Sequence, residues 1–497
     1  MHRSSAKIVL GLCSPGRYKL IMEENAAEFR IPNFEFGITV REGGRTVQVM
    51  EKNLTSGSVF KTIVFFALPY LLSYFLQTLY GMADLFIIGQ FGGVDGITAV
   101  SNGSQVMHML TVILVGLAMG TTVMVGRAIG GRKNDKASAA IGNTITLFMT
   151  VAVVLTVVLL IAVRYIVIII GTPAEAVSGT AGYLTICFIG IPFITAYNII
   201  SAIFRGLGDS KSPMYFIGIA CIANIILDYV FMGALNTGPV GAALGTVLAQ
   251  TLSVVIALIS IKRKNTGIKL TKSDFIPDRN VCGDILKVGL PVAVQDGCIQ
   301  AAFMIITVIA NHRGITDAAA VGIVEKVISA LFIVPSSMLA AVSALSAQNI
   351  GAGKPERAEK TLKYATMITT VYGIIVTVII EIAAEAVLTM FTKDSGVIVM
   401  GSRYIRGYIF DCIFAGIHFS FTGYFCAYGK SYIGFIHNMA AIVLVRVPGS
   451  YLASKIFADT LLPMGLAAPA GSFLSVIICV AAFIWLKNSG KLDVHNV

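Results

Sequence analysis

Long apolar stretches alternate with short polar connections along most of the chain after residue 58. A helix that crosses a membrane needs about 20 predominantly apolar residues, and twelve stretches reach that length. We predict spanning helices at residues 60–88, 98–126, 138–170, 176–206, 213–234 and 240–261, and again at 283–311, 316–346, 361–386, 400–428, 432–456 and 464–486. The pattern therefore predicts an all-α polytopic membrane protein.

Polar segments divide these helices into two sets of six. The longest hydrophilic connection, residues 263–282, is predicted to be a cytoplasmic linker between an N-terminal lobe at 58–262 and a C-terminal lobe at 283–486. Residues 487–497 then form a cytoplasmic tail. Residues 1–49 carry mixed charges and no spanning stretch. We predict that they are a disordered extension or lie upstream of the native start, and a small regulatory domain is the alternative.

The two sets share an internal repeat. The loop AIGGRKNDKA (Ala128–Ala137) corresponds to NIGAGKPERA (Asn349–Ala358) at an offset of 221 residues, and Leu68–Pro69 corresponds to Leu290–Pro291 with a slip of one residue. Because each half holds an even number of spans, the halves run parallel and are related by an axis along the membrane normal. This arrangement predicts two six-helix lobes with a cleft between them.

Composition supports this assignment. Hydrophobic residues make up 56% of the 497 residues and charged residues 13%, about half the soluble average of roughly a quarter. A soluble enzyme, a nucleic-acid binder and a disordered protein are thereby excluded. The eight cysteines show no CxxC pair or metal-ligand spacing, so we expect no disulfide and no thiol metal site. The chain has no GxxxxGK[ST], HExxH or GxSxG motif, and we expect no catalytic residue and no cofactor.

The distribution of positive charge orients the helices. With the N-terminus in the cytoplasm, the inside loops hold 18 Lys and Arg and the outside loops hold five. Cytoplasmic loops of membrane proteins carry such an excess, which accounts for the net charge of +11 without nucleic acid. We therefore predict a multi-pass protein of the cell (inner) membrane with both termini cytoplasmic, acting as a monomer in the lipid bilayer.

Polar side chains in the predicted helices gather on a few faces of the first half. Gln77, Tyr80 and Asp84 lie at i, i+3 and i+7, which is one helical face. Asn224 and Asp228 share a face at i, i+4. Two more helices contribute three further polar residues, Asn198, Thr246 and Gln250.

Two acids inside the membrane need an explanation. An Asp at mid-helix costs about 2.5–3.5 kcal/mol on insertion, so we expect Asp84 and Asp228 to line a wet interior and to exchange protons. The alternative is that they only hydrogen-bond helices together or lie near the membrane surface. In the second half, structural roles are favoured for the three acids Asp296, Glu325 and Asp411.

Several stretches together resemble the multidrug and toxic compound extrusion (MATE) transporters, in particular their bacterial and archaeal proton-coupled branch. The resemblance covers residues 58–486. It rests on ALPYLLSYFLQTLYGMADLFIIGQFGG in the first helix, FRGLGDSKSPM (Phe204–Met214), NIILD (Asn224–Asp228), GLP (Gly289–Pro291) and ALSAQNIGAGKPERA (Ala344–Ala358). It implies two six-helix lobes around a V-shaped cavity and secondary active efflux of small organic, often cationic, substrates in exchange for protons or sodium ions.

The resemblance also implies roles for particular residues. Pro69 matches a proline at which the first helix bends during transport. The cation- or proton-coupling set comprises Asp84, Asn224, Asp228, Gln77, Tyr80, Asn198 and Thr246. Sodium would find oxygen ligands at Asp84, Asn224, Asp228 and Thr246.

One departure from the family pattern favours protons. Sodium-coupled members carry an acid in the seventh helix where this chain has Ile299, so coupling is expected in the first lobe and mainly to protons. The alternative function is a flippase for lipid-linked precursors or polysaccharides, of the same superfamily. Such a flippase needs a strongly cationic central cavity, and the small number of Arg and Lys residues at mid-helix counts against it.

Overall fold

A computed structural model of the protein describes residues 9–12, 18–21, 38–42, 45–49, 54–263 and 268–492. The first half contains α1 (Val59–Phe91), α2 (Val94–Gly130), α3 (Asn134–Ile169), η1 (Ala174–Ala176), α4 (Val177–Ile189), α5 (Ile191–Gly206), α6 (Lys211–Asp228), η2 (Tyr229–Ala234) and α7 (Gly238–Arg263). After η3 (Lys272–Phe275), the second half contains α8 (Arg279–Asn311), α9 (Ile315–Leu331), α10 (Ile333–Gly351), α11 (Pro355–Thr389), α12 (Ser395–Tyr408), α13 (Asp411–Ala427), α14 (Ser431–Ala440), η4 (Ala441–Arg446), α15 (Val447–Ile456) and α16 (Leu462–Asn488).

These helices confirm the predicted fold class. In the described part of the chain, ten helical segments are long and apolar enough to cross a membrane, and two bent pairs raise the number to twelve. The pair α4 and α5 is bent by 50° and the pair α12 and α13 by 40°. The first bend was not predicted from the sequence. It lies just before Pro192, which has no N–H to continue the helical hydrogen bonds across the junction.

Four short strands precede the helices. They form two antiparallel hairpins, β1 (Val9–Leu12) with β2 (Tyr18–Ile21) and β3 (Ile38–Glu42) with β4 (Arg45–Val49). The other residues of the stretch 1–49 lie outside the described residues. The predicted disordered or non-native extension therefore stays a prediction.

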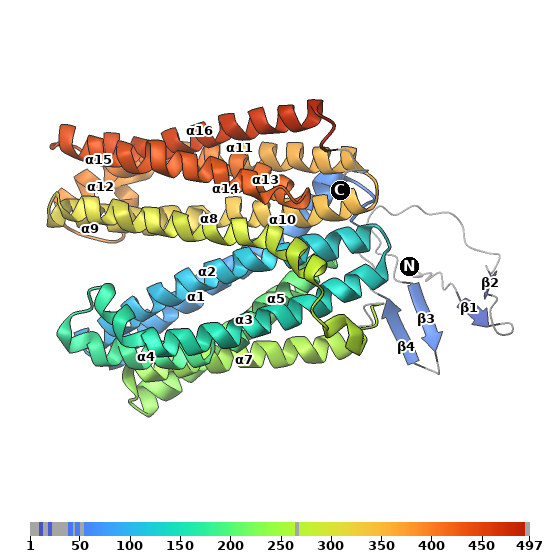
Figure 1. The fold of residues 1–497 in the computed structure, drawn as a ribbon. Coiled ribbons are helices and arrows are strands. Elements are labelled where there is room, and N and C mark those ends of the chain that lie inside the picture. The colour runs from blue at the N-terminus through green and yellow to red at the C-terminus, as the bar shows by residue number, and fades with distance from the viewer. Residues whose placement is uncertain are drawn as a thin grey trace, which may run out of the picture.

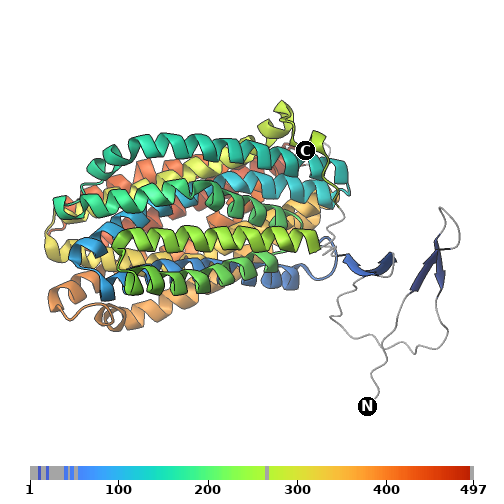
Figure 2. The same ribbon diagram turned by 90° about the horizontal axis from the view of Figure 1, so that it is seen from below.

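The helices form two groups that correspond to the two halves of the sequence. In Figure 1, α1 to α7 run from blue to green in one group and α8 to α16 from yellow to red in the other. Figure 2 shows that most of them run along a common direction. The groups lie close together where α2 and α10 end, and their ribbons separate towards α4 and α9 (Figure 1). The segment between the halves packs on α3, where Asn143 Nδ2 donates to Asp274 O (3.1 Å) and Thr146 Oγ1 to Phe275 O (2.8 Å).

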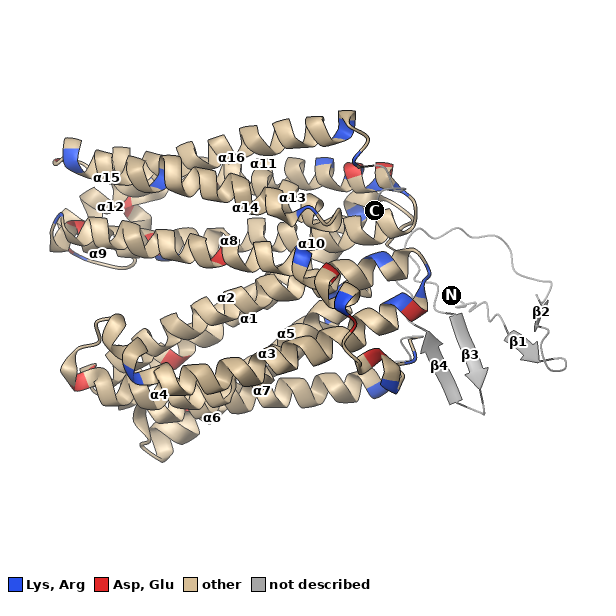
Figure 3. Cartoon of the chain, viewed as in Figure 1, with Lys and Arg blue, Asp and Glu red and all other residues tan. Residues whose placement is uncertain are grey.

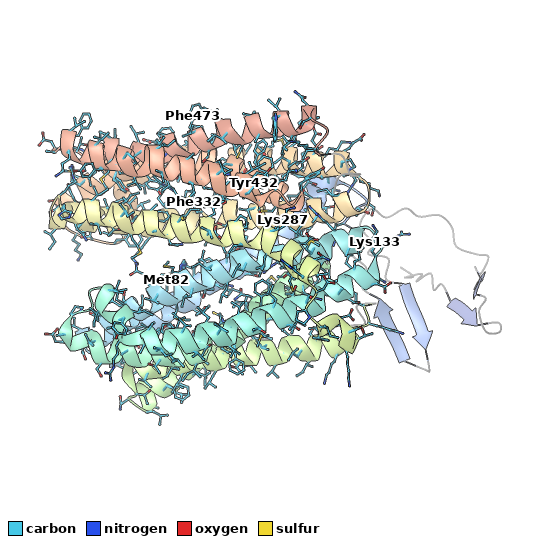
Figure 4. The ribbon with its side chains drawn as sticks, in the orientation of Figure 1. Met82, Lys133, Lys287, Phe332, Tyr432 and Phe473 are labelled. Carbon is cyan, nitrogen blue, oxygen red and sulfur yellow. The ribbon has the colours of Figure 1, made fainter. Side chains whose placement is uncertain are left out.

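The outer faces of the helices suit a hydrocarbon surrounding. Large apolar side chains are exposed along them, among them Phe473, which lies on the outer edge of the second lobe in Figure 4. Charged residues gather mainly at the ends of the bundle, and few lie at mid-height (Figure 3). Lys133 lies at the end where the lobes meet (Figure 4). A multi-pass membrane protein therefore follows from both the length and the surface of the helices.

Two glycines let the lobes touch backbone to backbone at the end where they meet. A Cβ at Gly130, the last residue of α2, would collide with the carbonyl oxygen of Gln348 in α10. A Cβ at Gly351, the last residue of α10, would collide with the carbonyl oxygen of Arg127 in α2. Only glycine fits such an approach without displacement of the backbone.

Side chains of the same two helices add matching hydrogen bonds. Arg127 donates from Nε and Nη2 to Ala427 O at the end of α13 (2.9 and 2.7 Å). Gln348 donates from Nε2 to Gly206 O at the end of α5 (2.8 Å). Every residue here has its counterpart 221 positions away, so the internal repeat becomes a pair of reciprocal contacts. We call Arg127, Gly130, Gln348 and Gly351 the interlobe latch.

Candidate functional site

Four of the predicted coupling residues meet inside the first lobe. Thr246 of α7 donates from Oγ1 to Asp84 Oδ2 of α1 (3.2 Å). The side chains of Asn224 and Asp228, one turn apart on α6, lie against the Asp84 carboxyl group. Asp84, Asn224 and Asp228 are almost fully buried. We call Asp84, Asn224, Asp228 and Thr246 the acid cluster.

The local backbone makes room for these carboxylates. A Cβ at Gly245 would collide with Asp228 Oδ1 and lie 3.6 Å from Asn224 Nδ2, so the absent side chain provides the space that Asp228 occupies. The π-helical turn η2 begins directly after Asp228, and such turns occur often at functional sites. The sequence reasoning did not assign Gly245 to this site. Its position next to Thr246 was the available signal.

The acid cluster has unsatisfied hydrogen-bonding capacity. Within residues 54–263 and 268–492, no hydrogen bond is made by Asp84 Oδ1, by either side-chain polar atom of Asn224 or by either carboxyl oxygen of Asp228. A buried polar atom without a partner costs about 1–3 kcal/mol, and two ionised carboxylates in contact repel each other. A proton or a small hard cation at this place relieves both costs. Carboxylate, amide and hydroxyl oxygens suit such a cation. In the described residues, no group of three or more His, Cys, Asp or Glu side chains is arranged so that it could hold a metal ion.

The three remaining predicted residues, Gln77, Tyr80 and Asn198, lie outside the acid cluster. Tyr80 lies near Asp84 and Gln250, so it borders the acid cluster. Gln77 lies near Tyr197, and Asn198 donates from Nδ2 to Ile194 O of its own helix (2.8 Å). Gln77 lies seven residues before Asp84, which is about 10 Å along the helix.

Gln77 and Asn198 line a narrow, partly open cavity. Its other walls are Tyr70, Ser73 and Tyr74 of α1, Val115 of α2, Tyr197 and Arg205 of α5, and Ser210 and Pro213 where α6 begins. We call this the first-lobe cavity. Sequence reasoning missed its tyrosines and Arg205. The i, i+4 spacing of Tyr70 and Tyr74 and the Arg205 in the FRGLGD stretch were the signals that could have found them.

Pro69 lies inside α1, which continues without a break from Val59 to Phe91. The residue is buried, and Ser73 donates from Oγ to Pro69 O (2.8 Å). The helix therefore contains a proline at which it could bend, and the structure shows the helix continuous through this proline. The role of hinge stays a prediction.

The acids of the second lobe have different surroundings. Asp411 forms a buried ion pair with Arg446 of η4 (2.9 Å), and Arg446 also donates to the Tyr408 hydroxyl (2.6 Å). Glu325 accepts a hydrogen bond from Thr307 Oγ1 (3.1 Å). Asp296 faces α2, where a Cβ at Gly116 would lie 3.2 Å from its Oδ2. The preference for structural roles at these three acids stays a prediction.

The chain is similar to known membrane transporters. The MatE family model matches residues 69–230 and again residues 291–452, one stretch in each lobe. Probable multidrug resistance protein YoeA of Bacillus subtilis is 24% identical over 440 residues, which cover 87% of this chain and 95% of that protein. The FAD transporter of Shewanella oneidensis is 23% identical over 432 residues, covering 86% and 94%. A crystal structure of MATE in the straight conformation superposes with a TM-score of 0.82 at 23% identity, covering 90% of this chain and 99% of that one.

Proposed function

Since the chain belongs to the MatE family of membrane transporters, we propose that it exports small organic molecules across the cell membrane in exchange for protons. The acid cluster is the observation that supports protons as the coupled ion. Two buried carboxyl groups lie in contact there, and three of their four oxygens accept no hydrogen bond from the described residues. Uptake of a proton removes one of the two negative charges inside the lobe. A change of charge that one conformation tolerates better than the other shifts the equilibrium between them.

We propose that the end with the interlobe latch faces the cytoplasm. The loops next to the latch carry Arg132, Lys133 and Lys354, as expected for the inside face. With this orientation, both termini are cytoplasmic and the structure corresponds to the state that is closed to the cytoplasm. The transport cycle then requires the latch to open while the lobes, residues 58–262 and 283–486, separate at that end.

Sodium ions are the runner-up for the coupled cation. The oxygens of the acid cluster suit a hard cation, but in the second lobe Asp411 is already paired with Arg446. The flippase alternative is not favoured, because YoeA is named as a probable multidrug resistance protein and the first-lobe cavity offers only one basic side chain among its described walls.

Transport driven by an imposed gradient tests the function. Purified full-length protein in liposomes is supplied with fluorescent compounds of both charge signs, under a pH gradient or under a sodium gradient at clamped pH. We expect uphill movement of at least one compound under the pH gradient and none under the sodium gradient alone. Uphill movement under the sodium gradient alone would identify sodium as the coupled ion. The absence of uphill movement under both gradients would contradict the proposed function.

The hinge proposal predicts a kinetic defect in Pro69→Ala. Pro69 leaves the carbonyl of Phe65 without its usual N–H partner, and alanine restores that hydrogen bond and makes bending of α1 costlier. We expect turnover in the liposome assay to fall several-fold while substrate affinity changes little. Pro469→Ala in α16, another proline inside a helix, is the matched control. Equal turnover of Pro69→Ala and wild type at saturating substrate would show that Pro69 only packs.

A further inference from the structure

The first-lobe cavity contains a positive charge that no acid neutralises. Arg205 is the single charged residue among its described walls. Over residues 54–263 and 268–492, the Arg205 guanidinium makes no ion pair and no hydrogen bond. Asp296 faces Tyr74 from the other lobe but does not line the cavity. An arginine carries five N–H donors, so this site can still bind an acceptor.

Aromatic rings flank the guanidinium. Arg205 Cζ lies 5.3 Å from the centroid of the Tyr70 ring. The rings of Tyr70 and Tyr74 are stacked, with centroids 6.4 Å apart and planes inclined by 28°. The Tyr197 side chain is also close enough to Arg205 to interact with its charge. Rings at the edge of a cavity offer surfaces on which a planar molecule can stack.

The other polar walls are uncharged. They comprise Ser73, Gln77, Asn198 and Ser210. The Ser73 hydroxyl and the Asn198 amide already donate to carbonyl oxygens of their own helices, which leaves oxygen lone pairs and one amide N–H for a guest. Hydroxyl and amide groups bind guests of either charge, so Arg205 decides the sign of the charge.

From these contacts we infer that the first-lobe cavity binds an organic anion, with a phosphate or carboxylate group on Arg205 and a planar ring beside Tyr70 and Tyr74. A guanidinium forms two parallel hydrogen bonds with such oxyanions, whereas a cation there is repelled. The inference rests on the proposed export function and replaces the expectation of a cationic substrate for this cavity.

The position of the cavity separates substrate from coupling ion. Tyr70 lies fourteen residues before Asp84, which is about 21 Å along α1. The residue after Arg205, Gly206, accepts the hydrogen bond of Gln348 in the interlobe latch. The anion therefore binds beside the latch and away from the acid cluster, and its binding can be measured without a working proton site.

Flavin mononucleotide and riboflavin form a matched pair of probes, because they share a fluorescent planar ring and differ by one phosphate. Binding to the full-length protein in lipid nanodiscs is followed by fluorescence quenching. We expect flavin mononucleotide to bind about tenfold more tightly than riboflavin, as for a hydrogen-bonded charge pair. Inorganic phosphate should compete only weakly, since it lacks the ring. Equal affinity of the two flavins, or tighter binding of planar cationic ethidium, would overturn the inference.

Variants assign the effect to Arg205. Arg205→Gln should remove the preference for the phosphate and leave riboflavin binding unchanged, and Arg205→Lys should keep part of it. Arg164→Gln, at an exposed arginine of α3, is the matched control and should keep the full preference. An undiminished preference in Arg205→Gln would contradict the assignment. If that variant misfolds, Arg205→Lys and the comparison of the two flavins on wild type still decide.

Failure of the inference and failure of the proposed function give different results. Asp84→Asn should retain the preference for flavin mononucleotide, because the acid cluster does not touch the cavity walls named above. Phosphate-selective binding without gradient-driven export would leave the anion site standing and remove the transport function. Export of cationic compounds with no phosphate-selective binding would do the reverse.

Discussion

Asp84→Asn and Asp228→Asn are each expected to reduce proton-driven export to background while the protein still inserts and folds. Asparagine has nearly the same shape as aspartate but cannot take up and release a proton. In each variant, one of the two carboxyl groups that meet in the acid cluster is lost, and with it the repulsion that a bound proton relieves. The measurement is substrate movement into liposomes under a pH gradient, with the amount of inserted protein determined in parallel.

A matched variant separates loss of coupling from a general effect of a lost charge. Asp95→Asn changes an exposed acid in the first turn of α2 and should transport like wild type. The two site variants should also still exchange substrate down its own gradient, because the first-lobe cavity is intact. Uphill export by a well-expressed double variant, Asp84→Asn with Asp228→Asn, would show that the coupling site lies elsewhere.

Gly130→Leu and Gly351→Leu are each expected to abolish transport by preventing closure of the latch. A side chain at either position meets a backbone carbonyl of the opposite lobe, and backbone cannot move aside as a flexible side chain can. The lobes would then be held apart at the end that carries the latch. Both variants should lose transport, and residues 127–131 and 348–353 should exchange amide hydrogens much faster than in wild type.

The control for this prediction is a glycine with free space around it. Gly322→Leu in α9 places its Cβ where nothing lies within 4 Å, so transport and exchange should stay near wild type. A weaker defect is expected in Gln348→Ala. This variant removes one hydrogen bond between the lobes but adds no side chain that would hold them apart. Normal transport by Gly130→Leu would show that this contact is not needed in the cycle.

The sequence alone predicted the architecture well, because a spanning helix carries its signal in its own residues. The length of each apolar run is set by the thickness of the bilayer, so the twelve spans follow without any knowledge of packing. The bends before Pro192 and between α12 and α13 were not predicted. Pro192 was a local signal for the first bend, whereas the second junction has no proline and depends on how neighbouring helices fit.

The site was predictable only in part. Spacing along each helix places Asn224 and Asp228 on one polar face and Asp84 on another, and the family resemblance grouped these residues with Thr246 into one coupling set. That these four meet, while Gln77 and Asn198 line a separate cavity, is decided by the packing of α1 against α6 and α7. No local pattern encodes a distance between helices.

Long-range partners required the tertiary structure entirely. Arg127 binds a carbonyl 300 residues away, and Asp411 is neutralised by Arg446 of another helix. The repeat that relates Gly130 to Gly351 was visible in the sequence, but its consequence was not. Sequence determined which residues could enter the membrane and on which helical face they lie, because both are local properties of a helix. Only the fold decided which faces meet, because the sum of contacts between distant segments selects a single arrangement of the helices.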